Sequence, residues 1–403
     1  MSQPPSIDRR IFVLALASFA MGTEAYVYAG HLEALAQELG RPIAAAGQLA
    51  TAFALTYAIT APVVAGLVAH VGRRTVLVAG LVLIGGLNLA GAASPSLGAL
   101  VVVRILCGLA AGLVGPISSI AAAELAPPER RGQAMAVVLG GMTLAFVLGI
   151  PTGSVIGDLA GWRGTFVYAG LVAFAAALAI RLVLPALPGG ARADRSALRG
   201  LRERAVQAYL SLTLVGFAAT FCVIAYVGPV VKAIAGFTGS GVGAMQVLIG
   251  VGSVVGIVIG GRAADRRAAD RVLPASFVVS ALALASYSAL IHGRGAAVGS
   301  AAGASVVAAL AIGMVIGAAA LFSRTPIIQA RLLAATRPET RPVALAFNGS
   351  MVFFGQGLGA GLGGAAIGVV GLEAVGLTGA AVALVGVALA LAAARTARPS
   401  AHG

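Results

Sequence analysis

Charged side chains are scarce in this chain. They make up 10% of its 403 residues, and only 13 residues are acidic, whereas soluble globular domains carry roughly 25% charged residues. Hydrophobic residues account for 59% of the sequence, and the mean hydropathy is +1.00. So low a charge content excludes an ordinary water-soluble domain. The apolar surplus indicates a protein whose main solvent is a lipid bilayer.

The motifs of common catalytic and metal sites are also missing. Cys107 and Cys222 fall inside apolar runs far apart in the sequence, so they predict neither a disulfide framework nor a metal-ligand spacing. The sequence has no Gly-Lys-Ser/Thr phosphate loop and no His/Glu metal pattern. His31 and His292 are expected at the outer membrane surface. We therefore expect no enzyme activity, no metal and no cofactor.

Apolar runs of about 20 residues, the length needed to cross a hydrocarbon core about 30 Å thick, recur along the whole chain. The first follows Arg9 and Arg10 and is longer than the apolar region of a cleaved signal peptide, so we interpret it as a spanning helix. The sequence thus predicts an all-α membrane protein with about twelve transmembrane helices. They are expected over residues 11–30, 47–69, 75–93, 98–123, 133–157, 164–186, 206–231, 241–262, 272–291, 297–322, 342–367 and 373–394.

The basic residues divide unevenly between the two sides of these helices. With the N-terminus inside, only Arg41, Arg163, Lys232 and Arg294 fall on the outer side, and Arg104 falls within a span. The rest of the 27 lysines and arginines fall on the inner side, which the positive-inside rule assigns to the cytoplasm. This distribution predicts a bacterial-type inner membrane protein with both termini cytoplasmic. It indicates contact with anionic membrane lipid and no nucleic-acid partner.

The longest polar connection, with five arginines, lies near the midpoint of the chain. On either side of it, Pro128-Glu129-x-Arg131 recurs 210 residues later as Pro338-Glu339-x-Arg341, each time before a glycine-rich span. Such internal repeats are typical of transporters whose halves move against each other around a central site. The sequence therefore predicts two pseudo-symmetric six-helix bundles, over residues 1–186 and 206–403, joined by a cytoplasmic linker over 187–205.

Two ionisable residues, Glu24 and Arg104, lie clearly inside predicted spans, at similar depth in the outer half of the bilayer. Each costs at least about 2.5–3.5 kcal/mol to insert, so each needs a reason to be there. Burial favours the protonated form of a carboxyl and a nearby cation favours its ionised form. The pair is therefore a candidate for proton coupling. The alternatives are a fixed salt bridge or a hydrogen-bonded neutral Glu24 that only orients helices, and an Arg104 that holds backbone carbonyls.

Polar side chains are also found on the spans that the sequence brings near this pair. Each can hydrogen-bond while presenting apolar or aromatic surface, so together they predict a substrate-binding cavity. The alternative is hydrogen bonding between helices, worth only about 0.6 kcal/mol per bond. The candidate substrate-binding residues are Thr23, Tyr26, Gln48, Tyr57, Tyr226, Asn348 and Gln356.

Four short motifs along the chain carry a family resemblance. They are Gly22–Gly30 followed by Ala46–Leu49, Arg104-x-x-Cys107-Gly108-x-x-x-Gly112, Gly149-x-Pro151-x-Gly153, and Gly161-Trp162-Arg163. With them the chain resembles the major facilitator superfamily, in particular its twelve-helix drug:proton antiporter branch and the arabinose-efflux and purine-efflux-like permeases. The resemblance implies that Arg104 takes part in proton coupling. It also implies that Gly149, Pro151 and Gly153 form the antiporter motif of the fifth helix.

One loop departs from the family pattern. The family carries Gly-x-x-x-Asp-Arg-x-Gly-Arg-Arg between the second and third helices, whereas here Ala65, Ala69 and His70 replace the Gly, the Asp and the first Arg. The corresponding segment of the second half keeps the Gly, Asp and Arg, so a cytoplasmic latch is expected mainly there. The candidate gating residues are Arg73, Arg74, Gly261, Asp265 and Arg266.

The resemblance implies proton-driven efflux of a small organic molecule by alternating access, in a protein that works as a monomer and is associated with drug resistance. Antibiotics, nucleosides and sugars are all substrates of the family, and a single acidic site would suit cationic or neutral compounds. Glu24 would carry the proton, and Arg104 would tune its proton affinity. The alternatives are a facilitator or proton symporter of the same fold, or a membrane receptor that transports nothing.

Overall fold

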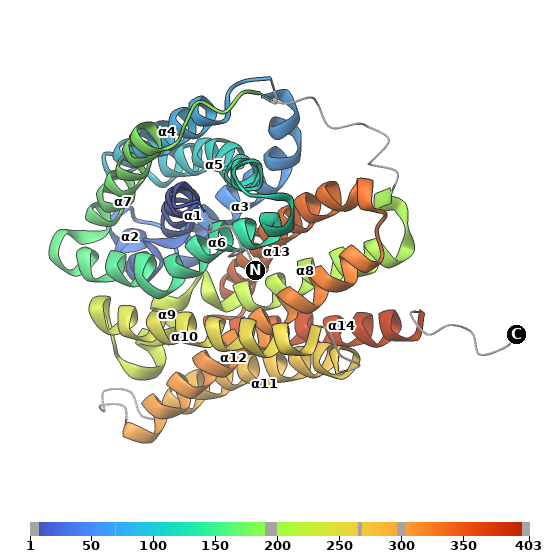
Figure 1. Cartoon of the computed structure of the whole chain (residues 1–403). Helices are drawn as coiled ribbons and strands as arrows, with labels where there is room; N and C mark the ends of the chain where they lie inside the picture. The colour runs from blue at the N-terminus through green and yellow to red at the C-terminus, as the bar shows by residue number, and fades with distance from the viewer. Residues whose placement is uncertain (1–7, 69, 190–199, 265–267, 296–302, 397–403) are drawn as a thin grey trace, which may run out of the picture.

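The structure is a computed structural model and describes residues 8–68, 70–189, 200–264, 268–295 and 303–396. Throughout these ranges the regular elements are helices, as predicted (Figure 1). In chain order they are α1 (Arg10–Tyr26), η1 (Ala29–His31), α2 (Leu32–Glu38), α3 (Ile43–Leu67), α4 (Arg73–Ala92), α5 (Leu97–Leu125), η2 (Pro128–Arg130), α6 (Arg131–Leu144), η3 (Ala145–Gly149), α7 (Ile150–Val183), α8 (Arg204–Ile224), α9 (Val227–Ala235), α10 (Gly239–Ala264), α11 (Ala269–Gly295), α12 (Ala304–Ala334), η5 (Pro338–Thr340), α13 (Arg341–Val369) and α14 (Ala374–Thr396).

Eleven segments of the described chain are long and apolar enough to cross a membrane, and one of them holds two crossings. That segment, Pro128–Val183, has 56 residues, so a straight helix of its length would extend about 84 Å, far more than a bilayer core of about 30 Å. The chain turns within it at Ala160 and Gly161, where Gly161 has a φ of +68° that glycine adopts without strain. The prediction of about twelve spanning helices is therefore confirmed.

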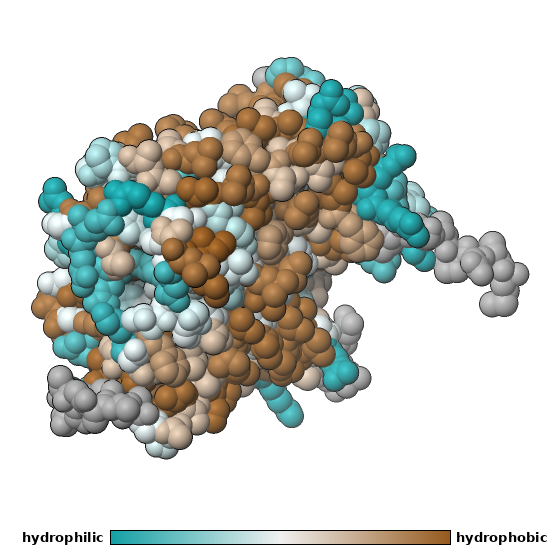
Figure 2. Space-filling model, turned by 90° about the vertical axis from the view of Figure 1, so that its left-hand side faces the viewer, coloured by the Kyte–Doolittle hydropathy of each residue, from teal (hydrophilic) through white to brown (hydrophobic). Residues whose placement is uncertain are grey.

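The surface has the apolar covering that lipid requires. On the face seen in Figure 2, hydrophobic residues cover broad areas, while hydrophilic residues gather along one side and at the tips. Large aliphatic side chains are more than half exposed at several crossings, and in water such apolar patches would favour aggregation. Examples are Leu159 (83%), Leu182 (74%) and Leu282 (67%).

The two halves share their local breaks as well as their helix count. The Pro-Glu segments form matching 3-10 turns, η2 and η5, and each leads into a helix at an arginine, Arg131 or Arg341. The opening helix of each half also stops early and is followed by a short helix: α1 by η1 and α2, α8 by α9. The predicted unbroken spans over 11–30 and 206–231 are therefore wrong at their outer ends. Run length cannot reveal such a break, because the residues around it stay apolar.

Within the N-terminal half, glycines let α1 lie directly against α6, η3 and the start of α7. A side chain at Gly141 would meet Ala15, one at Gly149 would meet Thr23, and one at Gly153 would meet Val27. Residue numbers increase in the same direction along both contacting segments, so α1 runs parallel to α6 and the start of α7. Close backbone approach through small residues is the main source of tight packing between helices in lipid. The predicted antiporter motif thus holds α1 against its own half.

Contacts between the two halves gather toward the end of the molecule that carries α2 and α9 (Figure 1). On α7 and α10, the hydroxyl of Ser154 donates to the Gln246 amide oxygen at 2.8 Å. A side chain at Gly243 would meet the Ser154 side chain. On α3 and α13, glycines such as Gly357 lie against Leu55. We refer to this end as the outer end, following the predicted orientation.

The same helix faces are exposed nearer to the other end. On α6, Gly140 and Leu144 continue the face that ends at Ser154, and both are exposed, Leu144 by 47%. On α10, Val254 is 48% exposed, and a Cβ at Gly261 would have nothing within 4 Å. The two bundles therefore meet at the outer end and separate toward the predicted cytoplasmic end, the arrangement of an inward-open state. The linker residues 190–199 lie outside the described residues, and the domain boundaries at 187 and 205 stay a prediction.

Replacing Gly153 with leucine should destabilise the fold, because the new side chain would overlap Val27, directly after α1. Overpacking of this kind costs about 1–3 kcal/mol. Thermal unfolding of the detergent-solubilised protein measures the effect, and Gly140→Leu is the matched control because nothing lies within 4 Å of that position. Equal melting temperatures for the two variants would contradict the packing described here.

Paired cysteines can test the closed outer end. A Cβ at residue 243 would lie 3.3 Å from the Ser154 Cβ, close to the Cβ separation of roughly 3.5–4.5 Å in a disulfide. Ser154→Cys with Gly243→Cys should therefore cross-link rapidly under mild oxidation in native membranes, while Gly140→Cys with Ile257→Cys should not. Cys107 and Cys222 are buried and give little background. Faster cross-linking of the second pair would overturn the inward-open assignment.

Candidate functional site

Glu24 and Arg104, the two ionisable residues predicted to act together, are in direct contact. Glu24 comes from the last turn of α1 and Arg104 from the outer part of α5, and both side chains are completely buried. Arg104 Nη1 donates to Glu24 Oε1 and, at 3.2 Å, to the Glu24 carbonyl oxygen. A buried pair of opposite charges avoids the large cost of an isolated ion in hydrocarbon.

The guanidinium of Arg104 also holds the end of α1. Its Nη2 donates to the Ala25 carbonyl at 2.9 Å, and α1 ends one residue later at Tyr26. The last carbonyls of a helix have no intrahelical partner, so a cation beside them satisfies them and interacts well with the helix dipole. The guanidinium also lies 4.4 Å from the centroid of the Phe53 ring. Both roles considered for Arg104, a charge partner and a carbonyl donor, are present together.

One oxygen of Glu24 has no hydrogen-bond partner. Its Oε2 is buried and unpaired, as are Tyr28 OH and Asn88 Oδ1. Asn88 Nδ2 donates to the Ile84 carbonyl at 2.9 Å, and Asn88 and Cys107 are the other polar neighbours of Glu24. Unsatisfied buried polar atoms are rare. Three such atoms therefore lie in the neighbourhood of the Glu24–Arg104 pair, which leaves hydrogen-bonding capacity unused there.

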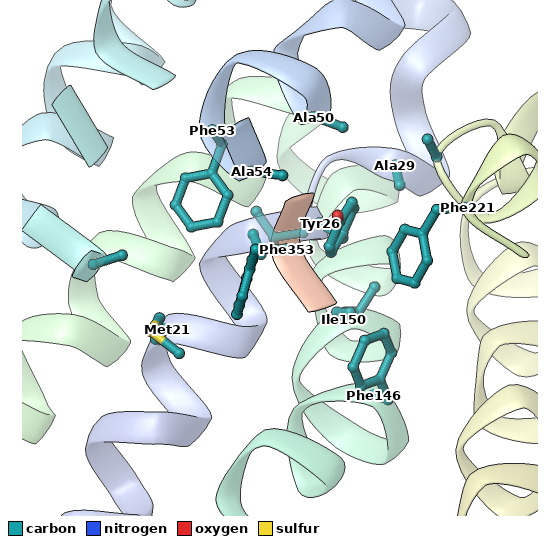
Figure 3. Close-up of a cluster of buried hydrophobic side chains, with 14 of the residues drawn as sticks. Met21, Tyr26, Ala29, Ala50, Phe53, Ala54, Phe146, Ile150, Phe221 and Phe353 are labelled. Atoms are coloured by element: carbon teal, nitrogen blue, oxygen red, sulfur yellow. The ribbon is translucent and has the colours of Figure 1, made fainter. Parts of the chain in front are cut away.

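Tyr26 connects this buried pair to the other half. Its hydroxyl donates to the Gln356 amide oxygen on α13 at 2.9 Å, and its ring lies 5.2 Å from that of Phe221 on α8. Figure 3 shows Tyr26 in the cluster of aromatic and aliphatic side chains that includes Phe221 and Phe353. A residue at the end of α1 therefore contacts the C-terminal half directly.

A small, partly open hollow lies beside Tyr26 between the halves, with about 290 Å³ of empty space that includes its open side. Its polar atoms come from Tyr26 and Gln246, and Gln246 Nε2 has no hydrogen-bond partner. The remaining wall is apolar, from Ala29, Phe146, Ile150, Ile224, Val227 and Ile249. Concave apolar sites with a few polar atoms are typical of small-molecule binding.

A second, partly open hollow with about 430 Å³ of empty space lies inside the C-terminal half. It adjoins the first, because Ile224, Val227 and Ile249 line both. Its hydroxyl groups come from Thr220, Ser280 and Tyr287. None of these three was predicted from the sequence.

The other predicted substrate-binding residues make contacts between or within helices. Thr23 packs against Gly149, and the Thr213 hydroxyl donates to Asn348 at 2.6 Å. Tyr226 OH donates to the Ala360 carbonyl at 2.9 Å. Gln48 Nε2 donates to the Ala44 carbonyl at 3.2 Å, and Tyr57 lies over Phe353 with ring centroids 3.8 Å apart. In this state, Tyr26 is the predicted substrate residue that lines the hollow between the halves.

The predicted gating residues are only partly described. Arg73 forms an ion pair with Glu124 at 3.4 Å, and its backbone N–H donates to the Leu187 carbonyl at 3.0 Å. Arg74 donates to the Leu184 carbonyl at 3.2 Å. Asp265 and Arg266 lie outside the described residues, and Gly261 is exposed. The described contacts tie the start of α4 to α5 and to the end of the N-terminal half.

The outer end carries two polar links between the halves that sequence reasoning missed. Lys232 on α9 forms an ion pair with Glu33 on α2 at 2.9 Å. The Asp158 carboxylate accepts the backbone N–H of Ser240 at 2.5 Å, which caps the start of α10 from the opposite half. Only three-dimensional proximity reveals these pairs, because their members are far apart in the sequence.

A third ionisable residue, Arg324, lies inside a spanning helix, so its predicted place on the cytoplasmic side is wrong. Arg324 was assigned to a cytoplasmic loop, because the tenth span was ended at residue 322. Helix α12 instead continues to Ala334, and the Arg324 side chain is 2% exposed. The apolar residues Ile327 and Ile328 that follow the arginine were the available signal.

Comparisons with known proteins agree with this architecture. The model of the Major Facilitator Superfamily matches residues 13–323. The uncharacterized MFS-type transporter YbcL of Bacillus subtilis is 30% identical over 92% of both chains. The chloramphenicol resistance protein of Streptomyces lividans is 33% identical over 64% of this chain and 68% of its own.

A solved D-xylose-proton symporter has the same fold, with a TM-score of 0.76, 18% identity, and coverage of 96% of this chain and 97% of its own. The members of this family are membrane transporters and not enzymes. The matched length, the twelve crossings and the two pseudo-symmetric bundles together identify the chain as a member of the major facilitator superfamily.

Proposed function

We propose that this transporter exports a small organic molecule in exchange for protons, by alternating access between its two bundles. The observation that carries the proposal is the buried Glu24–Arg104 pair, two positions before Tyr26, which contacts the opposite half. An intramembrane ionisable residue of this kind is a functional-site hypothesis by default.

The contacts of α1 suggest how a proton could act on the interface. Arg104 bonds the Glu24 carboxylate and the backbone carbonyls of Glu24 and Ala25. Protonation of Glu24 would remove its charge and weaken its hold on Arg104, which would shift the end of α1. Tyr26 is the next residue and contacts Gln356 and Phe221 of the other half. The charge state of Glu24 would thereby bias the contact between the bundles, which is what coupling requires.

The substrate is proposed to bind in the hollow beside Tyr26, with the other polar residues joining as the bundles move. The resistance protein of Streptomyces lividans supports efflux and makes chloramphenicol one candidate compound. Because a D-xylose-proton symporter has the same fold, import of the substrate together with protons is the main alternative to export. A receptor that transports nothing is less favoured, because the family to which the chain belongs consists of membrane transporters.

The orientation belongs to the same proposal. The protein would lie in the bacterial inner membrane as a monomer, with both termini in the cytoplasm, as the distribution of arginines favours. Arg73, Arg74, Gly261, Asp265 and Arg266 would then lie at the cytoplasmic end and form a latch when that end closes.

Glu24→Gln should abolish proton-driven accumulation while leaving downhill exchange of substrate intact. The amide keeps the size of the carboxyl but cannot carry a proton, so uphill transport in liposomes with an imposed pH gradient should fall to the passive level. Glu38→Gln is the matched control, because Glu38 is an exposed carboxylate paired with Arg163 at the outer surface. Uphill transport with unchanged pH dependence in Glu24→Gln would refute the proposed role.

A pH jump across liposomes distinguishes the proposal from its alternatives. An antiporter should move substrate out of the compartment that protons enter, whereas a proton symporter should move both in the same direction. Movement indifferent to the jump would indicate a facilitator. A purified protein that binds compounds in a thermal-shift panel yet moves none of them would indicate a receptor.

A further inference from the structure

Arg324 is a buried cation in the C-terminal half whose partners are all neutral. Its Nε donates to the Ala320 carbonyl at 3.1 Å, its Nη2 donates to the Ser280 hydroxyl, and it lies 4.1 Å from the centroid of the Phe277 ring. Its Nη1 is buried and has no hydrogen-bond partner. A guanidinium has five N–H donors in a fixed fork suited to a carboxylate, and here part of that fork is unused.

Within the part of the chain that the structure describes, Arg324 forms no ion pair. Among the described residues of the C-terminal half, the acidic side chains of Glu203, Asp270 and Glu373 are exposed. Asp270 is already paired with Arg331. In the N-terminal half, Glu24 is paired with Arg104. The described membrane interior therefore carries one more positive charge than negative, a costly state unless an anion joins it.

A binding hollow lies next to this charge. Ser280, which accepts the hydrogen bond from Arg324, also lines the 430 Å³ hollow of the C-terminal half. Thr220 and Tyr287 add two further hydroxyls, while Leu284 and Met314 add apolar wall. A ligand in this hollow would have apolar side chains around most of its surface. Its polar group could bond the Ser280 hydroxyl, which itself accepts a hydrogen bond from Arg324. The shared wall with the hollow beside Tyr26 connects it to the interface between the halves.

We propose that this hollow binds an amphipathic organic anion, with its carboxylate at the Ser280 hydroxyl that Arg324 bonds and its apolar ring against Leu284 and Met314. The proposal rests on the proposed transport function, since it names the class of substrate. It reverses the expectation from the sequence that one acidic site would favour cationic or neutral compounds, because Glu24 is occupied by Arg104 and the unpaired charge is positive.

A purely structural arginine would behave differently when removed. If Arg324 only joins α12 to α11, Arg324→Gln should lower the melting temperature of the ligand-free protein. If Arg324 instead serves to bind an anion, Arg324→Gln should leave the melting temperature of the ligand-free protein unchanged or raise it. The substitution would remove a desolvated charge that has no described counterion. Arg331→Gln, on the same helix but partly exposed and paired with Asp270, is the matched control.

The test uses three compounds that share one ring system: indole-3-acetate, its neutral amide indole-3-acetamide, and the cation tryptamine. Binding to the purified full chain in detergent is measured by thermal shift and calorimetry in gluconate buffer, with chloride tested separately. Indole-3-acetate should bind best to the wild type. Its affinity should fall at least about tenfold in Arg324→Gln, the loss expected for a hydrogen bond to a charged group, and should recover partly in Arg324→Lys. Arg331→Gln should bind as the wild type does.

Three outcomes would overturn the assignment: equal binding of the amide or the amine, an unchanged affinity in Arg324→Gln, or stabilisation by chloride as strong as that by indole-3-acetate. Flux assays separate this from the transport proposal. A protein that moves neutral or cationic compounds with a proton dependence would keep the proposed function and lose the anion assignment. A protein that binds indole-3-acetate through Arg324 but moves no compound would keep the anion assignment and lose the proposed transport function.

Discussion

The buried contact between Arg104 and the end of α1 is the constraint on which the N-terminal half depends. One guanidinium reaches the Glu24 carboxylate, two backbone carbonyls of α1 and the ring of Phe53. In a medium of low dielectric none of these groups could be left without a partner cheaply. The position at which α1 stops, and hence the place of Tyr26 at the interface, follows from where this cation lies.

The packing inside the N-terminal half differs from the packing between the two halves. Inside the N-terminal half, Gly141, Gly149 and Gly153 bring backbones into close contact over several turns, and such contacts leave little freedom to slide. Between the halves, polar pairs such as Ser154 with Gln246 lie at the outer end, and Tyr26 meets Gln356 nearer the middle, while α6 and α10 are exposed further in. Separation of the two bundles at the outer end would open a route to the outside without changing the packing inside either bundle.

Much of the fold could be predicted from the sequence, because its signals are local. Run length gives the twelve crossings, and the repeated Pro-Glu turns at Pro128 and Pro338 give the two halves. The candidate site could be predicted only in part. Glu24 and Arg104 stand out because charge is rare in an apolar run, but Arg324 was missed when its run was ended at the first charge. Whether a polar residue such as Tyr226 faces a cavity or a carbonyl depends on a neighbouring helix, which no local pattern encodes.

The charges of the two halves bear on what could drive transport. In the proposed cycle the N-terminal half carries a proton on Glu24, and the C-terminal half carries an anion near Arg324. Moving one proton inward and one monovalent anion outward transfers two positive charges toward the cytoplasm. Each charge is worth about 2.3 kcal/mol per 100 mV of membrane potential, so both movements are favoured in a cell with a negative interior. An exporter of a cation by the same exchange would gain nothing from the potential, because its charge movements would cancel. The unpaired arginine therefore fits a transporter that uses the membrane potential as well as the pH gradient.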